Sequence, residues 1–131
     1  MASMNNARPT QVFIVDDSAP IRARLVETLR DVADVAVTGE ATEAGAAVEA
    51  ILRDRPDSVV LDLNLGATSG MQVLRAVHPR LPHVVFVILT NHSEPQYRAA
   101  CSRAGAAYFL DKSTEFHRVR EVIARIAATR H

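Results

Sequence analysis

The feature that most constrains the fold of this sequence is the regular alternation of short apolar runs with longer segments of helical periodicity. Five runs rich in Val, Ile, Leu and Phe are predicted to be strands, at residues 11–15, 34–39, 58–61, 83–89 and 106–110. Apolar residues at helical spacing predict helices at 19–32, 42–55 and 69–81, and a last helix that begins near Ser113 or Thr114. A capping box of Ser93 and Gln96 predicts the start of a further helix between the last two strands. Strands that alternate with helices in this way form a parallel sheet with helices on both faces.

Right-handed crossover connections leave few arrangements for five such units. The common one is the three-layer α/β/α, flavodoxin-like (βα)5 fold, a parallel five-stranded sheet with the strand order 2-1-3-4-5. In such sheets, ligands bind beyond the carboxyl ends of the strands, near the first and third strands. We therefore expect functional residues directly after the predicted strands.

Length and charge limit the domain organisation and the partners. The chain of 131 residues predicts one domain at 11–131, preceded by a disordered tail at 1–10. Fifteen basic and fifteen acidic residues balance, so the chain has no overall attraction for nucleic acid or for a membrane. The apolar runs are too short to cross a bilayer, no signal peptide is evident, and Cys101 is the only cysteine, all of which predict a cytoplasmic protein.

Polar residues follow four of the five predicted strands. Asp16 and Asp17 follow the first strand and Asp62 follows the third, while Thr90 and Lys112 follow the fourth and fifth. All five residues therefore map to one edge of the sheet. Lys112 is the only lysine beside fourteen arginines, which indicates a position that needs a compact ammonium group.

This set of side chains predicts a particular chemistry. Three carboxylates in a partly desolvated pocket repel one another unless cations neutralise them. Oxygen ligands without His or Cys favour a hard cation, and few carboxylates with room for phosphate oxygens favour Mg²⁺ over Ca²⁺. An aspartate beside Mg²⁺ can attack phosphorus, while the metal, the lysine and the threonine share the charge of the transferring group.

Four motifs at these strand ends resemble the receiver domain of two-component response regulators. They are VDDS at 15–18, LDLNLGATSG at 61–70, LTN at 89–91 and DKS at 111–113. The resemblance covers residues 11–128 and implies that Asp62 accepts a phosphoryl group from a histidine kinase or a phosphotransfer protein. It implies a chemotaxis-type stand-alone receiver, with no enzymatic activity beyond its own phosphorylation and dephosphorylation. The final residues, ATRH, are compatible with a complete regulator and with a piece of a longer chain.

The same resemblance implies how the ligands would be held. Mg²⁺ would be bound by Asp17, Asp62 and the backbone carbonyl of Asn64, with Asp16 acting through water. Lys112 would bind the phosphoryl group.

The resemblance also implies a switch. Thr90 and Phe109 would move together after phosphorylation, whereas Gly70 matches the glycine that opens the third helix. Their movement would alter a face made of the fourth helix, fifth strand and fifth helix. A downstream protein or a second copy of the domain would bind there, with no nucleic acid and no membrane as partner.

Three residues differ from the usual pattern of the family, and a fourth lies next to one of them. Gly66 stands where proline is common, which predicts a looser loop after Asp62. Ser113 replaces a proline that often follows the lysine, so we expect a trans peptide bond before it. Asn91 is larger than the usual residue and His92 follows it, and both are expected to affect access to Asp62 and dephosphorylation.

Other functions remain compatible with the same fold. A flavin-binding electron carrier would offer hydroxyl and amide donors to the flavin phosphate after the first strand. This chain has DDSAP at 16–20 instead, and its two carboxylates would repel a phosphate. Dehalogenase-type phosphatases need a D-x-D motif there, and here the aspartates are adjacent. A receiver-like scaffold that is never phosphorylated is the third alternative, although the acids, the threonine and the lysine are all present.

Overall fold

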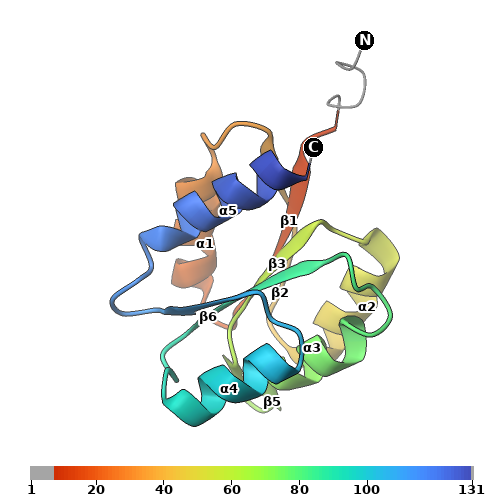
Figure 1. Cartoon of the computed structure of the whole chain (residues 1–131), viewed down its shortest axis with the longest axis vertical. Coiled ribbons are helices and arrows are strands. Elements are labelled where there is room, and N and C mark those ends of the chain that lie inside the picture. The colour runs from red at the N-terminus through yellow and green to blue at the C-terminus, as the bar shows by residue number, and fades with distance from the viewer. Residues whose placement is uncertain (1–7, 131) are drawn as a thin grey trace.

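The computed structural model describes residues 8–130, which form one five-stranded parallel sheet between two layers of helices (Figure 1). The sheet strands are β1 Thr10–Val15, β2 Val35–Ala41, β3 Ser58–Leu61, β6 Val85–Thr90 and β7 Tyr108–Asp111. The helices are α1 Ala19–Leu29, α2 Ala44–Asp54, α3 Gly70–Val77, α4 Pro95–Arg103 and α5 Arg118–Thr129. The sheet order is β2-β1-β3-β6-β7, so the predicted flavodoxin-like topology is confirmed.

The first strand begins one residue earlier than the hydrophobic pattern predicts. Thr10, assigned to the tail at 1–10, is fully buried in β1, and its N–H donates to the carbonyl of Asp34 at 2.7 Å. The guanidinium of Arg130 donates to the Thr10 hydroxyl at 3.3 Å. Because Thr10 is polar, the apolar run that predicts this strand does not include it. Residues 1–7 of the predicted tail lie outside the described residues.

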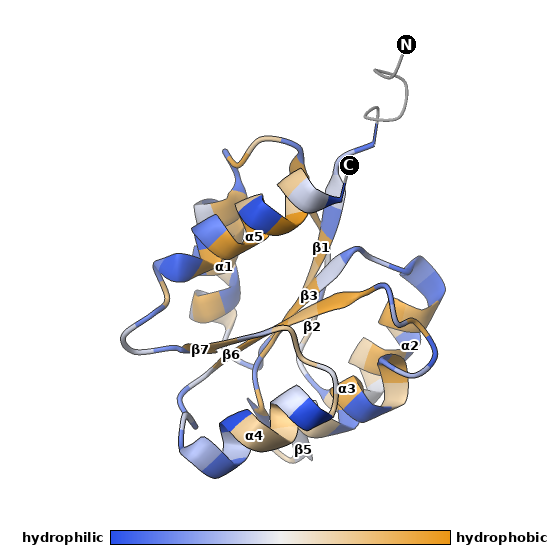
Figure 2. Cartoon of the chain, in the orientation of Figure 1, coloured by the Kyte–Doolittle hydropathy of each residue, from blue (hydrophilic) through white to orange (hydrophobic). Residues whose placement is uncertain are grey.

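The core lies on both faces of the sheet because successive strand side chains point to opposite sides. In β1, Val12 and Ile14 pack against α1 and α5, whereas Phe13 and Val15 pack against the layer of α2, α3 and α4. Figure 2 shows apolar strands, with hydrophilic residues on the outer sides of the helices. A sheet buried on both faces accounts for the continuous apolar runs.

Helix ends depart from the sequence prediction in two places. Ser18 caps α1 as expected, accepting from the N–H of Ile21 at 3.3 Å. The predicted capping box of Ser93 with Gln96 is wrong, because α4 begins at Pro95, after Glu94, and has no side-chain cap. A capping box forms instead at the start of α3, where Ser69 and Gln72 exchange hydrogen bonds.

The last helix begins later than predicted. The carboxylate of Asp111 accepts from the backbone N–H groups of Ser113 and Thr114, at 2.8 and 3.1 Å, and holds this segment in a turn. Helix α5 therefore begins only at Arg118. The peptide bond before Ser113 is trans, as predicted, because residues 8–130 contain no cis peptide bond.

The one cysteine is a packing residue of α4. Cys101 is fully buried, and its thiol lies 3.6 Å from the sulfur of Met71 on α3. Burial raises the pKa of the Cys101 thiol, although Arg75 partly opposes this effect. The raised pKa disfavours the reactive thiolate. Within residues 8–130, no helix has the length and apolar character needed to span a bilayer.

Candidate functional site

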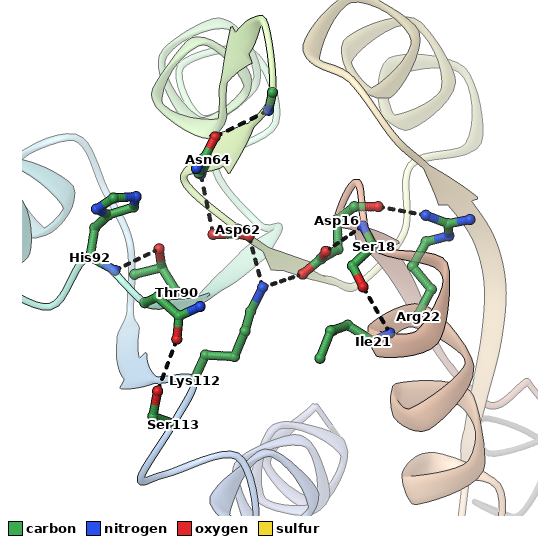
Figure 3. Close-up of polar contacts among 12 residues, drawn as sticks. Asp16, Ser18, Ile21, Arg22, Asp62, Asn64, Thr90, His92, Lys112 and Ser113 are labelled. Atoms are coloured by element: carbon green, nitrogen blue, oxygen red, sulfur yellow. Dashed lines mark hydrogen bonds and ion pairs between the residues drawn. The ribbon is translucent and has the colours of Figure 1, made fainter.

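The polar residues that follow the strands converge at one edge of the sheet, as predicted (Figure 3). Parallel strands place all of their carboxyl ends at the same edge, so residues far apart in the sequence become neighbours. A cavity of about 320 Å³ opens there. It is lined by Asp17, Ser18, Ile21, Asp62, Asn64, Asn91, His92 and Lys112.

Lys112 connects two of the carboxylates. Its Nζ donates to Asp16 Oδ2 at 2.7 Å and to Asp62 Oδ2 at 2.8 Å, and all three side chains are largely buried. Burial lowers the pKa of Lys112, but the hydrogen bonds and charges of Asp16 and Asp62 outweigh it and leave the pKa above its ordinary value. The lysine therefore stays charged and offsets part of the negative charge.

Three aspartates lie close enough together to share a cation. Asp16, Asp17 and Asp62 each offer a carboxylate oxygen, and these oxygens lie within 4.8 Å of one another. Asp16 and Asp62 are buried, whereas Asp17 is exposed at the mouth of the cavity. Three carboxylates and one ammonium leave an excess of negative charge, and the donors are all oxygen. This donor set fits Mg²⁺, which prefers a few carboxylates and keeps other positions for water or phosphate.

Backbone contacts orient the two buried aspartates. Asp16 Oδ1 accepts from the N–H of Ser18 at 2.8 Å, and the Asp16 carbonyl accepts from the guanidinium of Arg22 at 2.8 Å. Asp62 Oδ1 accepts from the N–H of Asn64 at 3.2 Å. Each carboxylate thus has one oxygen held by the backbone and the other held by Lys112.

The loop after Asp62 forms a hydrogen-bonded turn. It contains a small hairpin, β4 Asn64–Leu65 and β5 Thr68–Ser69, and the side chain of Asn64 accepts from the N–H of Gly66 at 3.1 Å. Gly66 has φ of 71°, a conformation that proline cannot adopt. Glycine at this position therefore permits a hydrogen-bonded turn, and its loosening effect on the loop stays a prediction.

Thr90 and Phe109 lie on neighbouring strands. Thr90 is fully buried at the end of β6, and its hydroxyl oxygen accepts from the N–H of His92 at 3.2 Å. Phe109 is half-buried on the α4 side of the sheet, whereas Tyr108 packs toward the opposite face. Both rings are therefore half-buried, on opposite faces of the sheet.

Arg98 of α4 contacts Phe109, a contact that the sequence analysis did not identify. Its guanidinium lies 4.5 Å from the centre of the ring and donates to the Phe109 carbonyl at 3.3 Å. Sequence spacing shows only that Arg98 is a polar residue of a helix. The contact arises because α4 packs beside β7.

Asn91 and His92 both line the cavity, as their positions suggested. The side-chain oxygen of Asn91 accepts from the Ser113 hydroxyl at 3.0 Å, which joins the loops after β6 and β7. The ring of His92 meets Tyr97 edge to face, with the ring centres 5.8 Å apart. Neither Ser113 nor Tyr97 was predicted to support these residues.

A larger cavity, of about 460 Å³, lies elsewhere in the described part of the chain, among residues of β6, β7 and α5. Its one acidic lining residue, Asp57, is already paired with Arg130 at 3.2 Å. It therefore lacks the group of carboxylates found at the strand ends. The smaller, more polar cavity is the better candidate for chemistry.

Comparison with known proteins agrees with this geometry. Residues 12–124 match the response regulator receiver domain. One curated relative is protein-glutamate methylesterase/protein-glutamine glutaminase 5 of Anaeromyxobacter dehalogenans (strain 2CP-C), which is 35% identical over 137 residues, covering 95% of this chain and 37% of the relative. The chain spans about a third to somewhat over half of the length of the curated relatives it matches.

Solved structures with the same fold include two receivers. The receiver domain of the response regulator NarL from Mycobacterium tuberculosis is 30% identical, with a TM-score of 0.83 over 92% of this chain and 98% of that one. The CheX-CheY complex of Borrelia burgdorferi with BeF3 and Mg²⁺ matches at 21% identity and a TM-score of 0.78, over 92% and 93% of the two chains. This chain therefore belongs to the receiver-domain family of two-component response regulators.

Proposed function

We propose that Asp62 accepts a phosphoryl group from a histidine kinase or a histidine phosphotransfer protein in the cytoplasm. One observation carries the proposal. The Asp62 carboxylate lines an open cavity, the Lys112 ammonium lies 2.8 Å away, and two further carboxylates lie close enough to share a metal ion with Asp62. Membership of the receiver family supports the assignment. The chain itself would catalyse only its own phosphorylation and dephosphorylation.

In the proposed reaction, a carboxylate oxygen of Asp62 forms a bond to phosphorus as the phosphorus–nitrogen bond of the phosphohistidine breaks. The imidazole leaves with the electron pair and takes up a proton. Lys112 would contact an oxygen of the transferring group, and the Thr90 hydroxyl would donate to another. The hydrogen of that hydroxyl is available because its oxygen acts as the acceptor toward His92.

Asp17, Asp62 and the backbone carbonyl of Asn64 would hold Mg²⁺ directly, with Asp16 acting through water. The ion supplies neutralisation of the charge that gathers on the phosphoryl oxygens. Asp17 suits a direct ligand because it is exposed at the cavity mouth and is not paired with Lys112. Asp16 is buried and, unlike Asp17, Asp62 and Asn64, does not line the cavity, which supports the more distant role.

Phosphorylation would act on the output face, defined as α4, β7 and α5. Donation from Thr90 to the phosphoryl group would draw its side chain toward Asp62 and leave space for Phe109 to turn inward. A coupling of about 1 to 3 kcal/mol shifts a two-state population by roughly 5- to 150-fold. We propose the chemotaxis-type mode of action, in which a downstream protein, or a second copy of the domain, binds this face.

The Mg²⁺ dependence provides a direct test. Asp17→Ala or excess EDTA should slow phosphorylation by acetyl phosphate by about 100-fold or more, the usual scale for losing an electrostatic contact to a transferring group. The measurement is the rate of phosphoprotein formation by intact mass. Glu49→Ala removes an exposed carboxylate from α2 and should keep the original rate. Labelling by the parent chain at an unchanged rate in EDTA would contradict the proposed metal site.

A second test follows the switch. Beryllofluoride with Mg²⁺ should change the NMR signals of the Phe109 amide and the Arg98 guanidinium, since turning the ring breaks their contact. Thr90→Ala should remove these changes while beryllofluoride still binds at Asp62. Signals of Val32, on the far side of the sheet, serve as the control. Unchanged Phe109 and Arg98 signals in the beryllofluoride-bound parent chain would exclude this switch.

A third test concerns the lifetime of the phosphorylated state. His92→Ala should shorten the half-life of the phosphoprotein because the ring lines the Asp62 cavity and its removal opens a path for water. A threefold change corresponds to about 0.7 kcal/mol of barrier. Asn91→Ala should act in the same direction, since it also frees Ser113. Thr114→Ala, an exposed loop change, is the control, and equal half-lives in all four proteins would remove both residues from this role.

A further inference from the structure

Charge is distributed unevenly in this neutral chain. Residues 70–110, which include α3, β6 and α4, contain four arginines and one acidic residue, whereas residues 31–69 contain eight acidic residues and two arginines. The surface formed by the carboxyl-terminal ends of α3 and α4 is therefore basic. We define it as the α3–α4 face, made of Arg75, His78, Arg80 and Arg103.

The arginines of this face have no ion-pair partner in the described part of the chain. Arg75, Arg80 and Arg103 are exposed, and within residues 8–130 none of them forms an ion pair. By contrast, Arg118 and Arg120 of α5 are each paired with a carboxylate. The helix dipole favours a cation in the last turn of α3 and of α4. This electrostatic effect still leaves the N–H groups of each guanidinium able to donate hydrogen bonds to a ligand.

Two of these arginines border one cavity. It has a volume of about 390 Å³ and is lined by Arg75, His78, Pro79, Ala100, Arg103 and Ala104. The Nδ1 atom of His78 is buried and has no hydrogen-bond partner among the described residues. A side chain at Gly105 would collide with the His78 ring, so this ring is packed tightly against the loop that follows α4. The cavity thus combines two guanidinium groups with a fixed histidine and contains no acidic residue.

We propose that this cavity binds a carboxylate side chain from an acidic segment of a partner protein. The planar guanidinium group can donate two parallel hydrogen bonds to a carboxylate, and arginine is common among residues that dominate protein interfaces. Complementary charge also speeds association and selects the partner. Among residues 8–130, no carboxylate lines the cavity, which favours a ligand from another molecule.

A nucleic acid fits the surface less well than an acidic protein segment. Helix α2 lies beside α3 (Figure 1), with Glu43 at its amino-terminal cap and Glu49 exposed, whereas its Asp54 is paired with Arg53 at 2.9 Å. DNA carries one negative charge per about 1.7 Å, so a duplex that extends from the α3–α4 face onto α2 meets these two glutamates. A short acidic segment can stay within the basic face.

This site shares α4 with the proposed output face but lies apart from the phosphorylation site. Asp62 lies near the amino-terminal end of α3, whereas the cavity lies at the carboxyl-terminal ends of α3 and α4. Binding there should not require the Asp62 carboxylate. Failure of the proposed phosphorylation and failure of this site are therefore distinguishable.

The test uses the full chain and a fluorescein-labelled hexaglutamate peptide at low ionic strength. The combined change Arg75→Gln and Arg103→Gln should weaken peptide binding, measured by fluorescence anisotropy, by at least about tenfold, the scale of losing a hydrogen bond to a charged group. The matched control, Arg55→Gln with Arg125→Gln, removes two exposed arginines that have no ion pair among residues 8–130 and should change the affinity less than twofold. Asp62→Asn should bind as tightly as the parent chain.

Amide NMR spectra verify that both double variants are folded, and they should place the peptide-induced shifts at Arg75, His78 and Ala104. Equal weakening in the two double variants, shifts elsewhere, or no peptide binding would overturn the proposal. Displacement of the peptide by equimolar inorganic phosphate would assign the cavity to free anions and reject a protein segment. Tighter binding of a 20-base-pair DNA duplex, lost in the Arg75 and Arg103 variant, would assign the face to nucleic acid and also reject it.

Discussion

Replacing Asp62 with asparagine is expected to abolish phosphorylation of the chain by acetyl phosphate and Mg²⁺. The amide has nearly the same size as the carboxylate, so the loop after β3 keeps its shape, but it lacks the anionic oxygen that attacks phosphorus. We do not expect the neighbouring Asp16 to substitute, because Asp16, unlike Asp62, does not line the cavity that a phosphodonor would enter. We expect no phosphoprotein above background.

The measurement is the intact mass of the protein after acetyl phosphate treatment. Asp34→Asn is a suitable control, since Asp34 is exposed and has φ of 61°, which asparagine tolerates well. The control should be labelled like the parent chain. Labelling of Asp62→Asn at the parent level would show that another residue is the acceptor. Absence of labelling in the parent chain itself would support the alternative of a scaffold that is never phosphorylated.

Gly70→Ala should destabilise the protein more than other single alanine substitutions at its glycines with negative φ. A Cβ atom at Gly70 would overlap the backbone carbonyl of Asp62, with the backbone of Leu63 within 3.0 Å, and backbone cannot move aside as a flexible side chain can. Overpacking of this kind costs about 1 to 3 kcal/mol and occasionally more, and we expect the upper end of that range. The shift would also move the phosphoacceptor, so phosphorylation should slow as well.

Chemical denaturation gives the free energy of unfolding for this comparison. Gly45→Ala is the matched control because Gly45 lies in the first turn of α2, where a Cβ atom meets only the side chain of Glu43 at 3.3 Å. Alanine is favoured over glycine in a helix by up to about 1 kcal/mol, so the control should be neutral or stabilising. A stable Gly70→Ala variant that is phosphorylated at the parent rate would show that this close approach is not required.

Local sequence patterns were sufficient for the architecture. The apolar runs at β3 and β6 are continuous because both faces of a central parallel strand are buried, and the helical stripes cover those faces. Once the order of strands and helices is known, handedness leaves one common topology. The strand ends then bring Asp16, Asp62, Thr90 and Lys112 to one edge, which is how the site could be predicted without any structure.

Local patterns were incomplete where the backbone conformation, and not the type of side chain, decides the local structure. Ser93 and Gln96 have the spacing of a capping box, but Pro95 begins the helix one position too late for it. The prediction for Gly66 considered only flexibility, whereas its positive φ forms a turn in which its N–H donates to the side chain of Asn64. In both cases a backbone conformation decided the outcome.

The sequence by itself determined the fold, the edge of the sheet at which the site lies and the residues that form it, because periodicity and strand ends are local properties. Only the tertiary structure decided which atoms meet. Lys112 bridges Asp16 and Asp62, Arg98 covers Phe109, and Arg75 and Arg103 share a cavity. These contacts join residues from different elements, and they depend on how helices pack against strands and against each other. Packing of this kind is a property of the whole core, so no local pattern encodes it.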